Sequence, residues 1–516
     1  MLLFCKYLLI IAVLGAESLQ AVLVSNRTIP TVDSSNITTQ GWTSSPQGRG
    51  TIDIIWSCLV TIFLCSWSVL CLQIPGRKDR QFEIFWRRAW LTALCALGPE
   101  FTLQLALGQW SSARHSVREF HDANIPEWTM KHAFHADSGG YVLQTPDFKP
   151  IPIDAKQLLY LTKHEYIQLK ILTEQELDDK NKVDFLLRLI SVGQAVWFVT
   201  TIIARGAQGL FITGMELTTA AFILCSFATT FCWWNKGADM AVPEVLTTTT
   251  TMARILIDGG DAASAPYHRT PLDFIGREEW HWSLYWTHWI NILRKMRINF
   301  APRSLPHDRI ENTVWHNILS PSQISIYLAI TIPYSGVLFF AWNDFFPTTT
   351  EQLLWRMASF GPVAAIPLYF GVTAFAFSAY PAMKLYFHTW QTSRSKSQII
   401  GSISPGSLPL NEASPVGQAQ HIVKLGPVSN LERLSGKPLK DRSKLSTLIA
   451  GWRNNSVLKD ASLDVPLKAS IPLYGVACLY CTSRSFILLE DMLQLRSLPS
   501  SAYTTVDWGG FFPHLA

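Results

Sequence analysis

The chain alternates between long apolar runs and long polar stretches. The first apolar run, residues 54–74, holds no charged side chain, ends at Pro75, and is followed by Arg77 and Lys78. An apolar run of about 20 residues is long enough to cross the hydrocarbon core of a bilayer as a helix. Positive charge directly after a span is typical of the cytoplasmic side. The pattern therefore predicts a span whose carboxyl-terminal end faces the cytoplasm.

The second apolar run, residues 89–110, differs from the first because Gly98, Pro99 and Glu100 interrupt it. Proline removes a backbone donor and kinks or breaks a helix. Irregular backbone at membrane depth is tolerated where protein surrounds it. Within residues 51–110, the first span is therefore followed by either a kinked span or a re-entrant hairpin.

The remaining apolar runs predict further spans. Two runs flank a short turn that begins at Arg205, and they predict a transmembrane helical hairpin over residues 185–234. Two spans are predicted within residues 323–383, and a last span is predicted over residues 471–496.

The number of crossings depends on the second apolar run. If this run crosses the membrane, the chain crosses seven times, and this is the count that hydropathy favours. If it does not cross, six spans remain and every basic loop faces the cytoplasm. The sequon at Asn454 distinguishes the two topologies, because its glycosylation would support seven crossings.

The amino-terminal segment has the features of a secreted or membrane-inserted chain. Residues 1–21 carry Lys6, then an apolar core too short to cross a bilayer, and then small residues, as a signal peptide does. The alternative is an uncleaved signal anchor. The polar segment 22–50 holds two glycosylation sequons, at Asn26 and Asn36. We expect this segment to be luminal or extracellular, and we expect the chain as a whole to be integral to an endomembrane or the plasma membrane.

Four polar stretches separate or follow the apolar runs, at residues 111–184, 235–322, 384–470 and 497–516. Within the second stretch, residues 280–297 place tryptophans at steps of three and four and end in basic residues, which predicts an interfacial amphipathic helix. The alternative is that this aromatic stripe packs against the spans. The loop 384–470 is basic and rich in Ser, Pro and Gly, which is typical of disorder.

Composition agrees with a membrane protein. The chain of 516 residues is 48% hydrophobic and only 16% charged, whereas soluble proteins carry about 25% charged residues. The net charge of +5 is too small and dispersed to indicate nucleic-acid binding. All nine cysteines lie in apolar segments, so no disulfide or zinc framework is indicated. We predict an all-α polytopic transmembrane helical bundle of six to seven spans whose partner is the lipid bilayer.

Charged residues inside apolar runs are candidates for function, because each costs about 2.5–3.5 kcal/mol to insert. The candidate catalytic acids are Glu100 and Glu216, and the candidate binding residues are Arg205, Arg484 and Glu490. The functional hypothesis is a buried polar pocket in which an acid donates a proton or anchors a ligand. The alternative is an ion pair of Arg484 with Glu216 or Glu100 that only fixes packing.

Other charged residues have simpler interpretations. Asp491 and Arg188 lie near span ends, where a side chain can reach the interface. His132, His135 and Asp137 lack the spacing of a zinc site, so no metal is predicted. Nucleotide-binding loops and nucleophile elbows do not occur, no cofactor is indicated, and whether the chain is an enzyme stays open.

Three stretches carry a resemblance to a known family. They run from Arg87 through Glu100 to Trp110, from Trp197 through Arg205 and Glu216 to Trp234, and from Arg484 through Glu490 to His514. In these stretches the chain resembles a large family of uncharacterised filamentous-fungal polytopic integral membrane proteins. The similarity covers most of the chain apart from residues 22–50 and 389–470, and it implies architecture without a substrate or a catalytic residue.

Three functions are compatible with these observations. The favoured one is a binding or accessory function for a lipophilic ligand or a membrane partner, since enzyme signatures are missing. One alternative is a membrane-embedded enzyme of fungal secondary metabolism, of the terpenoid or polyketide cyclase type. The other is a transporter, although the sequence shows no inverted repeat.

Overall fold

A computed structural model gives the architecture of the chain. It describes residues 39–45, 48–181, 185–238, 240–264, 267, 269–276, 305–313, 320–375, 383 and 467–509. The predicted signal peptide, Asn26, Asn36, the interfacial helix 280–297 and nearly all of the loop 384–470 lie outside the described residues.

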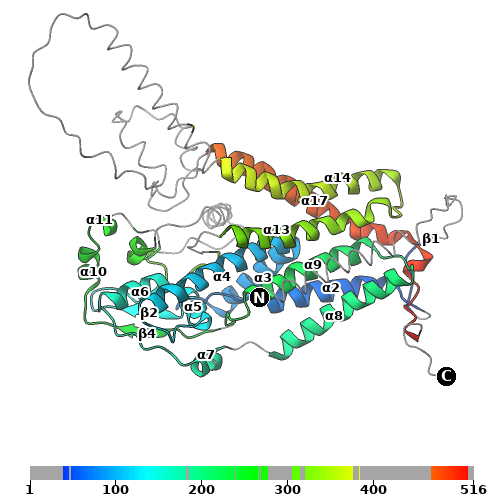
Figure 1. Ribbon diagram of the computed structural model, residues 1–516. Coiled ribbons are helices and arrows are strands. Elements are labelled where there is room, and N and C mark those ends of the chain that lie inside the picture. The colour runs from blue at the N-terminus through cyan, green and yellow to red at the C-terminus, as the bar shows by residue number, and fades with distance from the viewer. Residues whose placement is uncertain are drawn as a thin grey trace, which may run out of the picture. The chain divides into compact units, whose positions relative to one another are not determined.

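The described residues are mostly helical (Figure 1). The longest apolar helices are α2 (Thr51–Val69), α8 (Phe185–Ala207), α9 (Gly214–Cys232), α13 (Pro321–Gly336, continued by η2, Val337–Asn343), α14 (Thr349–Ala374) and α17 (Leu467–Leu493). Together they provide six helices that are long and apolar enough to cross a membrane. Large apolar side chains such as Leu189 and Trp197 stay exposed on them, as expected of faces that contact lipid.

The interrupted apolar run forms two helices, α3 (Gln81–Leu97) and α4 (Pro99–Asp122), whose axes differ by 114°. Gly98 has a non-helical backbone and Pro99 is the first residue of α4. Proline is well suited to that position, because the first helical N–H has no partner within the helix. The sequence thus placed this break correctly.

Contacts divide the chain into two units. One consists of residues 1–283, 303–364 and 479–516, and the other of residues 284–302 and 365–478. The helices α2 to α11 and the helix α13 lie in the first unit, where α9 packs against α2, α4 and α13. The first unit also holds the start of α14 and the end of α17.

The polar stretches of the first unit fold into short helices and strands. The helices are α5 (Met130–Asp137), α6 (Ala155–Lys163), α7 (Glu174–Lys180), α10 (Met252–Asp258), α11 (Gly260–Ala263) and the 3₁₀ helices η1 (Pro271–Ile275), η6 (Gln494–Arg496) and η7 (Ser500–Ala502). The strands are β1 (Thr39–Gln40), β2 (Tyr141–Gln144), β3 (Ile151–Ile153), β4 (Glu244–Thr247) and β5 (Leu498–Pro499).

The expectation of an all-α chain is confirmed in part, because the chain is mostly helical but also contains small sheets. Strand β2 pairs antiparallel with β3 and parallel with β4, and β1 pairs antiparallel with β5. Residues such as Tyr141, Val142 and Ile151 suit a half-buried pleated surface. The strands hold only two to four residues each, so hydropathy could not reveal them.

The histidines of residues 132–137 belong to the core beside this sheet. His132 Nε2 lies 2.6 Å from the Leu172 carbonyl oxygen, and His135 Nδ1 lies 3.4 Å from Met240 Sδ. Asp137 accepts a hydrogen bond of 3.1 Å from the Ala155 amide. Among the described residues, no group of three or more His, Cys, Asp or Glu could hold a metal ion.

Burial of His135 makes the stability of this region depend on pH. Desolvation, followed by the positive charge of Lys180 and the neighbouring His132, lowers the pKa of His135 to about 4, while Glu244 opposes the shift. The folded state therefore favours the neutral form of the His135 imidazole. Because the unfolded histidine titrates near 6.5, this stabilising contribution is present above pH 6.5 and is lost as pH falls toward 4.

We predict that lowering the pH from 7 to 4 reduces the free energy of unfolding by up to about 3 kcal/mol through His135 alone. His135→Gln should remove this part of the pH dependence, whereas the exposed His164 can be changed to Gln with no such effect. Thermal unfolding followed by tryptophan fluorescence between pH 4 and 7 measures it. An unchanged pH dependence in His135→Gln would contradict the prediction.

Candidate functional site

A buried polar cluster lies where the break between α3 and α4 meets α13 and α17. It consists of Glu100 on α4, Tyr334 on α13, and Tyr480 and Arg484 on α17. All four side chains are almost completely buried, with Glu100 only 4% exposed. The structure therefore brings two of the predicted site residues, Glu100 and Arg484, into one place.

Arg484 bonds to the end of α3 at the break between α3 and α4. Its Nε donates a hydrogen bond of 3.2 Å to the carbonyl oxygen of Leu97, the last residue of α3. Its guanidinium carbon lies 5.4 Å from the centre of the Tyr334 ring, which is a cation–π distance. The last carbonyls of a helix have no partner within the helix, so Arg484 satisfies one that the break at Gly98 exposes.

Glu100 lies among polar side chains, but not all of its possible hydrogen bonds are made. The charge of Arg484 and the hydroxyl groups of Tyr334 and Tyr480 act on its carboxyl group. Nevertheless Glu100 Oε2 and both hydroxyl oxygens have no hydrogen-bond partner at bonding distance and angle among the described residues. A buried polar atom without a partner costs about 1–3 kcal/mol. The cluster thus presents a buried carboxylate oxygen that can still accept a hydrogen bond.

Gly98 allows the cluster to close around Glu100. A Cβ atom on Gly98 would lie 2.8 Å from the Tyr480 hydroxyl oxygen and 2.7 Å from the Phe101 ring. The rings of Phe101 and Tyr480 meet edge to face, with centroids 4.9 Å apart. The missing side chain at the break therefore lets Tyr480 approach the start of α4.

Two more acids lie near the end of α17. Glu490 and Asp491 are both buried, and Glu490 Oε1 and both carboxyl oxygens of Asp491 have no hydrogen-bond partner in the described chain. The expectation that Asp491 reaches the interface is wrong, because its side chain is 2% exposed. The charges of Glu351 and Arg496 act on the Glu490 carboxyl group.

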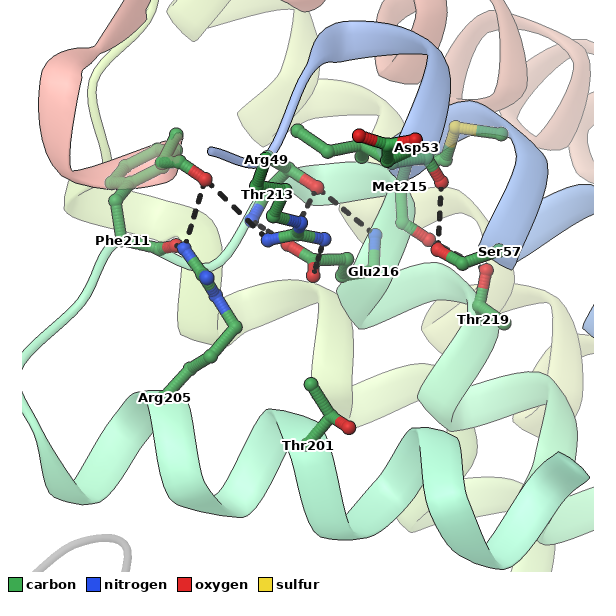
Figure 2. A network of polar contacts seen from close by, with 12 residues as sticks. Arg49, Asp53, Ser57, Thr201, Arg205, Phe211, Thr213, Met215, Glu216 and Thr219 are labelled. Carbon is green, nitrogen blue, oxygen red and sulfur yellow. Dashed lines mark hydrogen bonds and ion pairs between the residues drawn. The ribbon is translucent and has the colours of Figure 1, made fainter. Parts of the chain in front are cut away.

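Glu216 lies elsewhere and is fully bonded. It is the third residue of α9, where its Oε2 accepts hydrogen bonds of 3.0 Å from the backbone amide and the hydroxyl group of the N-cap Thr213. Its other oxygen forms an ion pair with Arg49 (Figure 2). Glu216 thus belongs to the cap of the first turn of α9. Its contacts are those of a structural residue.

Arg205, near the end of α8, makes several hydrogen bonds close to Glu216. Its guanidinium donates to the carbonyl oxygens of Phe211 (2.8 Å), Ser501 (3.1 Å), Ala502 (3.0 Å) and Thr504 (2.8 Å). In Figure 2 it points from α8 toward Phe211. We call Arg49, Arg205 and Glu216 the terminal clasp, because they join α8 and α9 to the segment that follows α17.

The proposed structural pairing of Arg484 with an acid takes a different form. Arg484 forms an ion pair with neither Glu100 nor Glu216 in the part of the chain that is described, since Glu216 is bound by Arg49 and Arg484 donates to Leu97. Tyr334 and Tyr480 were not identified from the sequence because their hydroxyl groups carry no charge. Tyr480 lies four residues before Arg484, so helical spacing could have indicated it.

The two acids should respond differently to the loss of a charge. We predict that Glu216→Gln lowers the free energy of unfolding by about 3–5 kcal/mol, because it breaks a buried ion pair and leaves Arg49 without its partner. Glu100→Gln should cost less, since Glu100 forms no direct ion pair among the described residues, although the change also removes a negative charge that acts on the buried Arg484. Thermal unfolding in one detergent compares them, with the surface variant Glu119→Gln as the control. Equal losses at the two positions would show that Glu100 is also a packing residue.

Comparison with known proteins identifies one similarity. A family of unknown function, DUF8562, matches residues 21–258. No curated protein and no solved structure matches the chain. The matched region contains Glu100 and the terminal-clasp residues, and it ends with α10, before Tyr334 and Arg484. The amino-terminal half of the chain is thus similar to a family that has no assigned activity, as the sequence led us to expect.

Proposed function

We propose that the chain is an integral membrane protein of the secretory pathway with six crossings, in which α3 and α4 form a re-entrant hairpin. The six apolar helices and their exposed apolar side chains support the crossings. The signal-like segment 1–21 and the sequons at Asn26 and Asn36 support the pathway and a luminal amino-terminal segment.

Contacts at both ends of the bent pair support the hairpin. Before α3, the Gln73 side chain donates to the Asp137 carbonyl (3.3 Å) and the Ile74 amide donates to the Ser138 carbonyl (3.0 Å). Asp137 ends α5, the helix that follows α4. The chain therefore enters α3 and leaves α4 beside the same loops, as a segment does when it returns to the face it came from.

Glycosylation mapping tests the hairpin. Pro126→Thr creates a sequon at the exposed Asn124, just after α4. We expect neither Asn124 in this variant nor the native Asn454 to be glycosylated, because six crossings place both in the cytoplasm. Modification of Asn26 and Asn36 is the internal control, read as a mobility shift after endoglycosidase treatment. Glycosylation at Asn124 and Asn454 would show that α3 and α4 cross the membrane.

Within this bundle, we propose that the protein binds a lipophilic molecule that carries a protonated amine. The observation that carries this proposal is the buried Glu100 oxygen that lacks a donor beside two tyrosine hydroxyls. Arg484 Nε already donates to Leu97, and its guanidinium lies against Tyr334. The tyrosine hydroxyls can donate or accept, and Glu100 Oε2 still lacks a donor at bonding distance and angle among the described residues. An ammonium group supplies both the donors and the charge that a buried carboxylate requires.

The broken helix favours a transporter as the second candidate. Transporter sites are often built where discontinuous helices meet near the middle of the membrane. Glu100 is the second residue after the break at Gly98. A carrier would use the same ligand chemistry but would also move the ligand across the bilayer, so the two functions share a binding step and differ in flux.

Three small molecules with the same ten-carbon tail and different head groups test the binding step. In nanodiscs we expect decylamine to raise the unfolding temperature more than decanol does, and decanoate to have no effect, because Glu100 selects a cation. Glu100→Gln should lose the response to decylamine, whereas Glu119→Gln should keep it. Stabilisation by decanoate instead would identify Arg484 as the anchor and refute the proposed ligand class.

Flux separates the two candidates. Decyltrimethylammonium carries a permanent charge and does not cross a bilayer readily by itself. Uptake into proteoliposomes above the level of Glu100→Gln proteoliposomes would identify a carrier. Uptake no greater than in protein-free liposomes would support a binding protein.

A further inference from the structure

The buried Asp491 lies against the start of α9. A Cβ atom on Gly214, the first residue of α9, would lie 2.8 Å from Asp491 Oδ1 and 3.0 Å from Gln494 Oε1. Two side-chain oxygens from α17 and η6 therefore converge on one point beside the α9 backbone. The glycine makes this approach possible, since any other residue would place a carbon atom there.

A third oxygen belongs to the same group. Thr218 lies one helical turn after Gly214, and its side chain interacts with the carboxyl group of Asp491. Its Oγ1 is buried and has no hydrogen-bond partner among the described residues. Residues four apart lie on the same face of a helix, so Thr218 and Gly214 face Asp491 together.

The charge of Asp491 is not balanced by a direct contact. Both of its carboxyl oxygens lack a hydrogen-bond partner in the described residues, although the side chain is 2% exposed. Arg484 acts on it only at a distance, since seven residues separate them, which is about 10 Å along a helix. A buried carboxylate without a paired charge is strongly unfavourable.

The oxygens offered here suit a hard monovalent cation. Carboxylate, amide-carbonyl and hydroxyl oxygens are ligands of hard cations, whereas soft metals prefer sulfur and imidazole. One carboxylate balances one positive charge. The charges that act on Glu490 are those of Glu351 and Arg496, and Glu490 acts on Asp491 through its charge alone.

We propose that Asp491, Thr218 and Gln494 bind a sodium ion beside the start of α9. The ion neutralises the Asp491 carboxylate and holds the end of α17 against α9. Gln494 extends the effect, because its side chain also bonds to the Gly214 amide (3.2 Å) and the Phe345 carbonyl (2.9 Å). This site does not depend on the ligand proposed for Glu100.

Cation-dependent stability tests the site. We expect NaCl to raise the unfolding temperature of the full-length protein by several degrees relative to equimolar choline chloride, with a saturable dependence on Na⁺. Asp491→Asn should remove the dependence and should be at least as stable as the wild type in choline, because it removes the unbalanced charge. The adjacent Glu490→Gln is the matched control and should keep a saturable response to Na⁺, because it leaves the three oxygens of the site in place.

Direct binding completes the test. Thr218→Val keeps the shape of the side chain, removes one oxygen, and should weaken ²²Na⁺ binding by about tenfold, which corresponds to the loss of one modest interaction. Equal stability in sodium and choline would overturn the proposal, and so would a sodium response that persists in Asp491→Asn. If Asp491→Asn does not fold, unchanged ²²Na⁺ affinity in Thr218→Val overturns it.

Discussion

The hydrogen bond from Arg484 to Leu97 is the interaction on which the interior of the bundle depends. A helix that breaks among apolar helices exposes carbonyl groups that water cannot reach. Arg484 supplies the donor across α17 and α3, and its charge also lies against Tyr334. Because Arg484 bonds to the Leu97 carbonyl in this way, Glu100 at the start of α4 forms no direct ion pair with it in the described part of the chain.

Glu100 and Glu216, the two candidate acids predicted from the sequence, thus differ in their hydrogen bonding. Glu216 has a partner for each oxygen, and its ion pair with Arg49 belongs to the terminal clasp. Glu100 keeps an oxygen that no described residue satisfies. Burial and charge are the same for both, so the difference between a packing residue and a candidate site lies in how completely the hydrogen bonds are made.

Local sequence patterns predicted much of the architecture, but they did not predict most of the contacts in the candidate site. Apolar runs located the long helices, and Gly98 with Pro99 located the break, since both signals lie within about 20 neighbouring residues. The partners of the charged residues are far away in the chain: Arg49 and Glu216 are 167 residues apart, and Arg484 and Leu97 are 387 apart. No local pattern encodes such pairs. The short strands were missed because hydropathy needs longer segments than they offer.

Pairing of β1 with β5 has a consequence for the order of events during synthesis. Residues 39–40 meet residues 498–499, and the Tyr503 hydroxyl donates to the Gly41 carbonyl (2.9 Å). The strand edge at residues 39–40 therefore stays unpaired until residues 498–499, which follow α17 in the chain, have been synthesised. Closure of these strands thus requires that α2, α8, α9, α13, α14 and α17 have been synthesised first, so β1 can pair only late in the formation of the bundle.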